Sequence, residues 1–396
     1  MECYFDNSAT TPLREEVLEE ILSLSRLCWA NPSSAHRLGL EAERRLKEAR
    51  ALTAESLRAQ PKEIVFTSGG TEANNLALKG IAKAAGQRGR HIISSMAEHD
   101  SVYQSLCSLE EEGFSVTYLR PDRQGRIRAE QVREALREDS FLIALMHVNN
   151  EVGAVLDIEE LSRQTETWNR ERKIPLCLHL DAVQSYLRRE LDMGKLRAVS
   201  SMSVSAHKVH GPKGVGALYL REGVRVRPLI DGGGQERARR SGTENTLGVY
   251  AFAKAVALQA GDIEKRRAKI GALRERFERE AAKLPDVVFH SSAGGAEHIC
   301  SLAFSGVPGE VLLHTLEQEG VYVSTGAACS SKKKGSRILE SMNLPKAERE
   351  STLRFSFSEF NTPEQVDYAV SVLEKKLQEL RGILKYKYTD AKKGKR

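Results

Sequence analysis

The sequence predicts an α/β fold in which a mostly parallel sheet is covered by helices on both faces. Between about residues 40 and 220, short apolar runs alternate with helical stretches. Strands that are buried on both faces of a parallel sheet have such nearly continuous apolar runs. After about residue 255, a long helical stretch leads into further strands and a last helix. This change of pattern predicts a second, smaller α+β domain.

The expected elements follow from periodicity and from turn residues. Residues 41–58 are expected to form a helix with one apolar side, which carries Ala42, Leu46, Ala49 and Leu57. The apolar runs predict seven strands, at 63–68, 91–95, 115–119, 141–148, 175–180, 198–205 and 214–220. Beyond them we expect one helix over 245–284, the strands VVFH, ICSLAF and LRFSFS, and a helix over 363–386. These elements divide the chain into a large domain, 14–255, and a small domain, 1–13 and 256–396.

Composition excludes several classes of protein. The 396 residues carry a net charge of only +6, so the sequence does not predict a nucleic-acid partner. No apolar stretch approaches the roughly 20 residues that a membrane span needs. The N-terminus lacks the basic and apolar regions of a signal peptide. The cysteines form no CxxC pair, which is typical of reduced thiols in a cytoplasmic protein. The basic end, KYKYTDAKKGKR, more often forms a solvated tail than a partner contact.

Two charged residues follow expected strands at the edge where open α/β sheets bind ligands. Asp181 ends the run PLCLHL, and Lys208 follows the next strand in SVSAHKVHGPKG. Taken alone, Asp181 would more often be a helix cap or loop residue, and Lys208 a solvated loop lysine. A lysine that is desolvated or close to another cation has a lowered pKa, and its neutral amine can condense with an aldehyde.

The turn Ser68-Gly69-Gly70-Thr71 opens an expected helix. Free N–H groups and the helix dipole favour an anion there, although such a turn is also ordinary N-cap chemistry. An anion site, a carboxylate and an amine together are what pyridoxal phosphate (PLP) requires for its phosphate, its ring nitrogen and its aldehyde. The sequence therefore predicts a PLP site, and it predicts no metal site.

Along nearly its whole length, the chain resembles the NifS/IscS-type cysteine desulfurases of the fold-type-I aminotransferase superfamily. The matching stretches are FDNSATTP, NPSSAHRLG, IVFTSGGTEANNLAL, AEHDSV, HVNNEVG, HLDAVQS, SAHKVHGPKGVGALY, GGGQERARRSGTEN, STGAACSS and LRFSFS. Their order and spacing make the match specific. The resemblance implies an aminotransferase-like large domain with a seven-stranded sheet, and the conversion of L-cysteine to L-alanine.

The resemblance also implies a role for each site residue. Lys208 would hold the cofactor covalently and shuttle protons, Asp181 would pair with the ring nitrogen, and Gln184 would hydrogen-bond the ring hydroxyl. His99 would stack on the ring and help to move a proton. The residues that hold the phosphate would be Gly70, Thr71, Ser205 and His207.

Three further residues receive roles from the same resemblance. Thr243 would reach the phosphate of the neighbouring subunit, so a homodimer is implied. Asn150 and Arg354 would bind the substrate carboxylate, a task that suits the planar fork of arginine. Without the resemblance, His99 and Asn150 would each more often be structural.

Cys329 is expected to carry the sulfur as a persulfide to an acceptor protein, for iron–sulfur cluster assembly or tRNA thiolation. Residues 324–336 are small, polar and basic, which is the composition of a mobile loop. Lys332, Lys333 and Lys334 would lower the thiol pKa, keep the loop solvated or contact an acidic partner, and the last two interpretations are favoured. The other cysteines are expected to be inert packing residues; they are Cys3, Cys28, Cys107, Cys177 and Cys300.

The Cys329 segment also departs from the family pattern. Scaffold-serving members usually have SSGSACTS where this chain has STGAACSSKKKG, which leaves the identity of the acceptor open. Two alternatives share the scaffold: a selenocysteine lyase, and another PLP-dependent lyase or aminotransferase, which would not need Cys329. A catalytically silent scaffold that only binds partners is the alternative from another class, and the intact set of cofactor residues argues against it.

Overall fold

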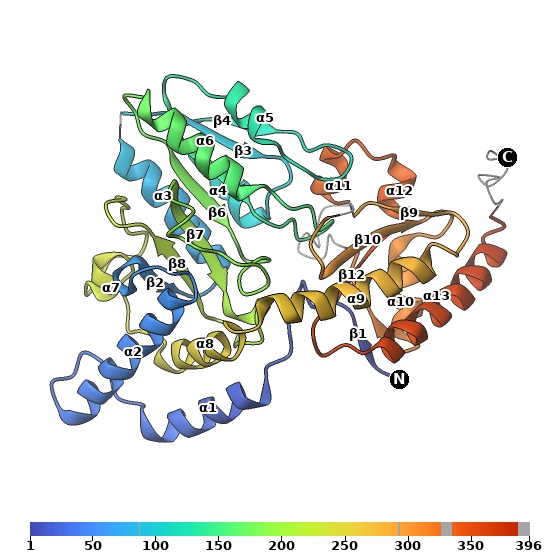
Figure 1. The fold of residues 1–396 in the computed structure, drawn as a ribbon, viewed down its shortest axis with the longest axis horizontal. Coiled ribbons are helices and arrows are strands. Elements are labelled where there is room, and N and C mark those ends of the chain that lie inside the picture. Colours follow the sequence, from blue (N-terminus) through green and yellow to red (C-terminus); the bar gives the residue numbers. More distant parts are fainter. Residues whose placement is uncertain (87, 292–293, 326–334, 387–396) are drawn as a thin grey trace.

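The large sheet of the predicted α/β fold is confirmed. The computed structural model describes residues 1–86, 88–291, 294–325 and 335–386. Seven strands form one sheet in the order β2-β8-β7-β6-β5-β3-β4 (Figure 1). All neighbouring strands from β7 to β4 are parallel, and β8 is antiparallel to β7 and β2. The strands are β2 (Ile64–Thr67), β3 (His91–Ser95), β4 (Ser115–Leu119), β5 (Ser140–Met146), β6 (Cys177–Asp181), β7 (Val199–Ser205) and β8 (Gly216–Leu220).

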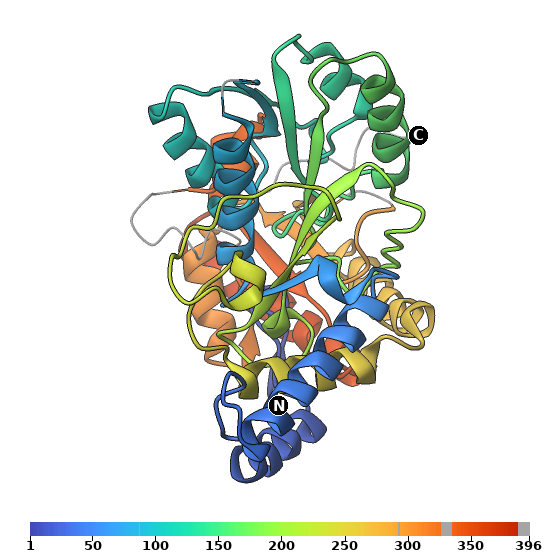
Figure 2. The same cartoon turned by 90° about the vertical axis from the view of Figure 1, so that its left-hand side faces the viewer.

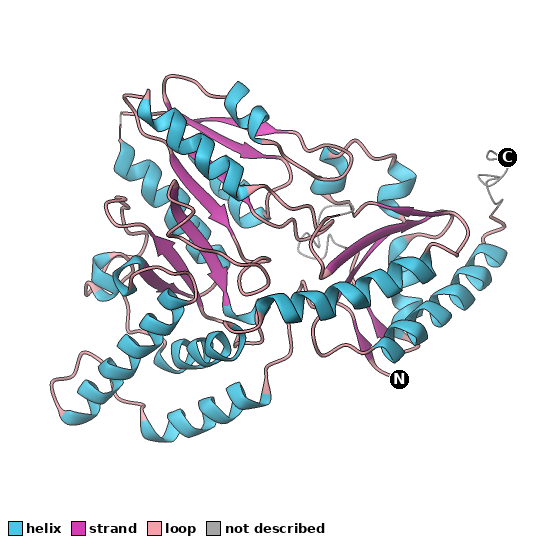
Figure 3. Cartoon of the chain, in the orientation of Figure 1, coloured by secondary structure: helices cyan, strands magenta, loops and turns pink. Residues whose placement is uncertain are grey.

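Helices cover both faces of this sheet, as Figures 2 and 3 show. Alternate residues of β5 belong to different cores: Ile143 and Leu145 pack in one buried cluster, Leu142 and Ala144 in another. Burial on both faces explains why the strands have nearly continuous apolar runs. The helices of this part are α1 (Glu15–Leu27), α2 (Arg37–Glu55), α3 (Gly70–Ala85), α4 (Asp100–Glu111), α5 (Ala129–Glu134), α6 (Ile158–Arg170), α7 (Gln235–Ala238) and α8 (Thr246–Gln259).

A second, smaller set of elements comprises the chain after α8, orange and red in Figure 1, and the blue N-terminal strand. An antiparallel sheet has the order β12-β10-β9, and a parallel pair joins β1 to β11. The N-terminal strand therefore packs with the C-terminal part of the chain. The elements are β1 (Cys3–Tyr4), α9 (Ile263–Ala281), β9 (Val287–Phe289), β10 (Ile299–Phe304), α10 (Gly309–Glu317), β11 (Val321–Tyr322), α11 (Arg337–Ser341), α12 (Lys346–Glu350), β12 (Thr352–Ser356) and α13 (Pro363–Ile383).

The single helix predicted over 245–284 is wrong, because the chain breaks between α8 and α9. Gly261 favours a break, and Asp262 adopts a left-handed backbone with φ 53°. Helix α8 packs against α1 and α2, whereas α9 packs against α13. The break is therefore where the chain changes packing partners. No helix among the described residues is long and apolar enough to cross a membrane.

A buried ion pair fixes the segment that leads towards Thr243. Arg50 of α2 donates to both carboxylate oxygens of Glu236, at 2.6 and 2.7 Å, and the Phe66 N–H donates to the same carboxylate at 3.1 Å. Glu236 begins a run of three non-glycine residues with positive φ, which a chain adopts only at a cost in free energy. The pair holds this strained run against β2.

We expect Arg50→Met to lower the free energy of unfolding by about 3–5 kcal/mol, because it leaves the Glu236 carboxylate buried without its cation. Urea unfolding followed by circular dichroism measures this change. Arg44→Met on the same helix is the control, since Arg44 is exposed and solvent screens its ion pairs with Glu41 and Glu48. Equal stability of the two variants would contradict the assignment.

Candidate active site

The predicted site residues follow the carboxyl ends of four neighbouring parallel strands. These ends meet at one edge of the sheet, where open α/β sheets bind their ligands. His99 follows β3, Asn150 follows β5, Asp181 ends β6 and Lys208 follows β7. The parallel arrangement of these strands thus brings residues that are distant in sequence to the same edge of the sheet.

The Asp181 carboxylate is buried and held by neutral donors. Its side chain is 4% exposed, and it accepts hydrogen bonds from Asn74 Nδ2 at 2.8 Å and from the Val183 N–H at 3.0 Å. Among the described residues, no lysine, arginine or histidine makes an ion pair with it. A buried carboxylate with neutral donors is suited to a cationic group placed opposite it.

Asn74 connects Asp181 to three other elements, and sequence analysis did not identify it. Its Oδ1 accepts from His179 Nε2 at 3.0 Å and from the Ser203 hydroxyl at 2.5 Å, and its Nδ2 also donates to Ser101 at 2.8 Å. Asn74 lies on the buried, otherwise apolar side of α3. A polar residue on the apolar side of a helix was the signal that could have indicated it.

His99 is held in one neutral tautomer beside this network. Its Nδ1 accepts from the Ser101 N–H at 3.1 Å and from the Ser101 hydroxyl at 2.8 Å, so the ring proton belongs on Nε2. Burial lowers the pKa of His99; the Asp181 charge opposes this effect and the Lys208 charge adds to it. Both charges therefore act on the imidazole, which is neutral at pH 7.

Lys208 and Gln184 share a backbone acceptor in the N-terminal segment. Lys208 Nζ donates to the carbonyl oxygens of Ser8 and Ala9, each at 2.6 Å. Gln184 Nε2 donates to the Ser8 carbonyl at 2.9 Å. The structure thus brings together the residues predicted to bind the aldehyde and the ring hydroxyl. Ser8 was missed, because its contribution is a backbone oxygen that no side-chain pattern reveals.

A groove at the start of α3 gathers the predicted phosphate residues. Gly70, Thr71, Ser205 and His207 all line it, together with Thr10. Gly69 has φ 153° and ψ −176°, a conformation that is practically restricted to glycine. A Cβ on Gly70 would lie 2.6 Å from Val183 Cγ2. Burial lowers the pKa of His207 to about 4, so its neutral ring faces the groove.

Arg354 and Asn150 lie together where a substrate carboxylate is expected. Arg354 Nη1 donates to the Asn150 carbonyl at 2.7 Å, and Nη2 donates to the Asp6 carboxylate at 2.8 Å. Within the described part of the chain, Arg354 Nε and Asn150 Oδ1 are buried without a hydrogen-bond partner. A buried donor without a partner is costly in free energy. The Arg354 Nε–H group is therefore suited to an incoming carboxylate.

Cys329 lies outside the described residues, but the chain on either side of 326–334 is fixed beside the site. Ser324 pairs with Arg354 through two backbone hydrogen bonds, of 3.1 and 2.6 Å. On the other side, the Ser336 hydroxyl donates to the buried Glu151 carboxylate, and Arg337 Nη2 donates to the Glu98 carbonyl at 2.6 Å. Both ends of the segment therefore contact residues next to Asn150 or His99.

Thr243 does not join the other predicted residues in the single chain. It is exposed, in the segment between α7 and α8. This position leaves it accessible to a second subunit, and its predicted role stays a prediction.

The residues present fit PLP. The groove at the start of α3 offers backbone N–H groups and hydroxyls to a phosphate, and the Asp181 carboxylate has only neutral donors. Lys208 supplies an amine at the same edge of the sheet. These groups are what the cofactor requires, and each of them comes from a different element.

Comparisons with known proteins agree with this arrangement. The aminotransferase class-V family model matches residues 3–369. The chain is 40% identical to the cysteine desulfurase IscS of Dictyoglomus turgidum over 389 residues, which covers 98% of this chain and 97% of that protein. It is 39% identical to the IscS of Methanosarcina thermophila over 383 residues, which covers 96% and 93% of the two chains.

Solved structures of related proteins superpose on nearly the whole chain. A NifS-like protein superposes with a TM-score of 0.90 at 35% identity, covering 96% of this chain and all of that chain. SspA in complex with cysteine superposes with a TM-score of 0.80 at 34% identity, covering 91% of this chain and all of that chain. The sheet, the groove at α3 and these full-length matches lead to one conclusion: the chain belongs to the aminotransferase class-V family.

Proposed function

We propose that this protein is a PLP-dependent cysteine desulfurase, which converts L-cysteine to L-alanine and holds the removed sulfur as a persulfide on Cys329. The observation that carries the proposal is that the segment containing Cys329 is fixed on both sides next to the Lys208 site. Ser324 contacts Arg354, and Ser336 contacts Glu151. The names of the full-length relatives support the same activity.

The chain's own residues divide the work on the substrate. When bound, PLP would supply an electron sink for the carbanion that forms at the substrate Cα. Arg354 and Asn150 would hold the carboxylate and so orient the Cα–H bond towards Lys208, whose amine would accept the proton. His99, which carries its ring proton on Nε2, would donate a hydrogen bond or a proton to the reacting centre. Asp181 would stabilise positive charge opposite its buried carboxylate.

The sulfur step balances without an added oxidant. The Cys329 thiolate attacks the substrate sulfur, an S–S bond forms and the substrate C–S bond breaks. The carbon then takes up a proton and leaves as alanine. The persulfide sulfur passes to a thiol of an acceptor protein, for iron–sulfur cluster assembly or tRNA thiolation.

The environments of the five other cysteines support Cys329 as the nucleophile. Cys3 and Cys300 are fully buried and Cys28 is 3% exposed. Burial raises the pKa of the Cys3, Cys177 and Cys300 thiols, which disfavours the thiolate that attacks sulfur. Cys107 is half-buried, with its sulfur 4.0 Å from the Tyr118 hydroxyl.

An exposed apolar face supports a homodimer as the functional unit. Leu18 and Leu22 lie one turn apart on α1, and they are 38% and 54% exposed. Leu27 and Trp29, at the end of the helix and just beyond it, are 66% and 70% exposed. Exposed apolar side chains gathered on one element are typical of an interface, and α1 packs against α8, the helix that directly follows the exposed Thr243 segment.

We expect borohydride reduction of the purified protein to attach a pyridoxyl group to Lys208, as mass spectrometry of the digested protein would show. Lys208→Ala should lose this adduct and at least about 100-fold of the alanine production, because it removes both the attachment point and the base. Lys195→Ala, which changes an exposed lysine, is the control. An unchanged rate in Lys208→Ala would exclude the assignment.

After exposure to L-cysteine, the wild-type peptide that contains Cys329 should gain one sulfur atom. Cys329→Ser should still bind cysteine and change the cofactor spectrum, yet release no alanine, because the spectral change needs only the cofactor and Lys208. Cys107→Ser should behave as wild type. Full activity of Cys329→Ser, or an extra sulfur on another cysteine, would favour the lyase alternative.

Light scattering should give the mass of two chains. Leu22→Asp should weaken the dimer and, with it, the retention of cofactor, because it places a charge within the apolar face. Ile383→Asp is the matched control: Ile383 is 75% exposed at the end of α13, outside that face. A fully active monomer at assay concentration would contradict the dimer.

A further inference from the structure

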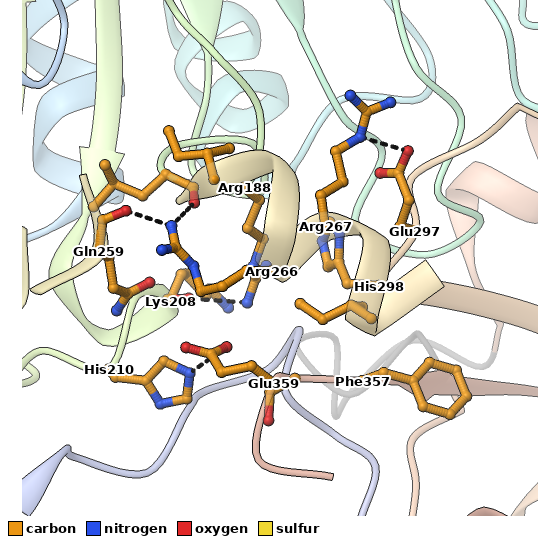
Figure 4. Close-up of a pocket in the computed structure, with 14 residues that line it drawn as sticks. Arg188, Lys208, His210, Gln259, Arg266, Arg267, Glu297, His298, Phe357 and Glu359 are labelled. Atoms are coloured by element: carbon orange, nitrogen blue, oxygen red, sulfur yellow. Dashed lines mark hydrogen bonds and ion pairs between the residues drawn. The ribbon is translucent and has the colours of Figure 1, made fainter. Parts of the chain in front are cut away.

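A polar pocket lies directly behind Lys208, at the boundary of the two sets of elements (Figure 4). Arg188, Lys208 and Arg266 line it, together with Gln259, His298 and Glu359. Its two carboxylates are engaged elsewhere: Glu359 pairs with Arg14 and His210, and Glu297 pairs with Arg189 and Arg267. Among the described residues, neither Arg188 nor Arg266 makes an ion pair in this wall; Arg266 donates to the backbone carbonyls of residues 187, 259 and 261, and only Arg188 of these two contacts the candidate active site.

Arg188 instead bridges two residues of the candidate active site. Its Nη1 donates to Gln184 Oε1 at 3.0 Å, and its Nη2 donates to the Lys208 backbone carbonyl at 2.9 Å. Two longer contacts, each of 3.4 Å, reach the backbone carbonyls of Gln184 and Asn7. The guanidinium thus joins the side chain of Gln184, the backbone of Lys208 and the N-terminal segment.

These contacts determine which way the Gln184 amide faces. A guanidinium can only donate, so the atom opposite Arg188 must be the amide oxygen. The nitrogen then faces the other way, where it donates to the Ser8 carbonyl, the oxygen that also accepts from Lys208 Nζ. A ring of hydrogen bonds results, running from the Lys208 carbonyl through Arg188, Gln184 and Ser8 back to the Lys208 amine.

We propose that Arg188 is a positioning residue, which turns the Gln184 amide nitrogen towards the cofactor ring and fixes the Lys208 backbone beside it. The inference rests on the proposed function, in which Gln184 contacts the ring hydroxyl. A Gln184 that can only donate there favours the deprotonated ring oxygen. Burial lowers the pKa of Arg188 to about 10, so the guanidinium remains charged at pH 7 beside the Lys208 backbone.

The test measures the bound cofactor in the absence of cysteine. In Arg188→Met, the pH midpoint of the cofactor's visible absorbance should rise by about half a unit or more, because the anionic ring oxygen loses its fixed donor and a nearby cation disappears. The dissociation constant for PLP should rise about tenfold, as expected for one lost charge-assisted hydrogen bond. Arg188→Lys keeps the charge but not the fork, and it should fall between wild type and Arg188→Met.

Arg189→Met is the matched control. Arg189 is the next residue along the chain, and its side chain pairs with Glu297 instead of contacting Gln184 or Lys208. It should leave both the absorbance midpoint and the PLP affinity unchanged. A merely structural role for Arg188 would give the two variants the same spectrum and affinity, and that result would overturn the proposal.

A double-mutant cycle keeps the proposal falsifiable if Arg188→Met folds poorly. In a Gln184→Ala background, Arg188→Lys should shift the midpoint by much less than it does alone, because its effect passes through the amide. Equal shifts in both backgrounds would overturn the inference. Failure of the wild-type protein to form alanine from cysteine would reject the proposed function. The cofactor titration would still test the positioning role of Arg188.

Discussion

The buried carboxylate of Asp181 is the constraint on which the site depends. A charge in the interior of a protein is tolerated only when donors surround it, and here the donors are the Asn74 amide and the Val183 N–H. Asn74 must be held in turn, and His179, Ser203 and Ser101 hold it. Ser101 also fixes the tautomer of His99. One buried charge thus sets the positions of β6, β7, α3 and the start of α4 relative to one another.

The N-terminal segment connects this network to the smaller part of the molecule. Asp6 pairs with Arg354, and the Ser8 N–H donates to the Ser356 hydroxyl at 2.8 Å, so the segment is bound to β12. The Ser8 and Ala9 carbonyls meanwhile accept from the Lys208 amine. The same few residues therefore contact the group that would hold the cofactor and the group that would hold the substrate carboxylate.

Much of the fold could be predicted because a sheet buried on both faces needs apolar strands, and the runs at 91–95 and 115–119 match β3 and β4 to the residue. The family was also predicted correctly, and the comparisons confirm it. The helix over 245–284 was wrong because apolar and charged periodicity continues across Gly261 and Asp262, although the backbone does not remain helical there. The backbone conformation at these two residues thus ended a helix that the periodic pattern alone would continue.

Sequence reasoning identified only some of the residues that the structure brings to this site, for a physical reason. Asp181 and Lys208 were singled out because a carboxylate, an amine and an anion-binding turn together match what PLP requires. Asn74, Ser8 and Arg188 were missed because their roles depend on backbone carbonyls or on partners distant in sequence. Arg188 contacts Lys208 across 20 positions, and the Ser8 carbonyl meets Lys208 across 200. Such contacts exist only once the chain has folded.

A single-turnover measurement tests the central claim most directly. The loaded protein is mixed with L-cysteine equimolar to its sites, with no other thiol present, and quenched, and the alanine released and the sulfur retained on the protein are both counted. We expect equal amounts of the two, about one of each per loaded site, since each C–S bond broken leaves one S–S bond on Cys329. Release of free sulfide with pyruvate, or of alanine without any sulfur retained on the protein, would contradict it.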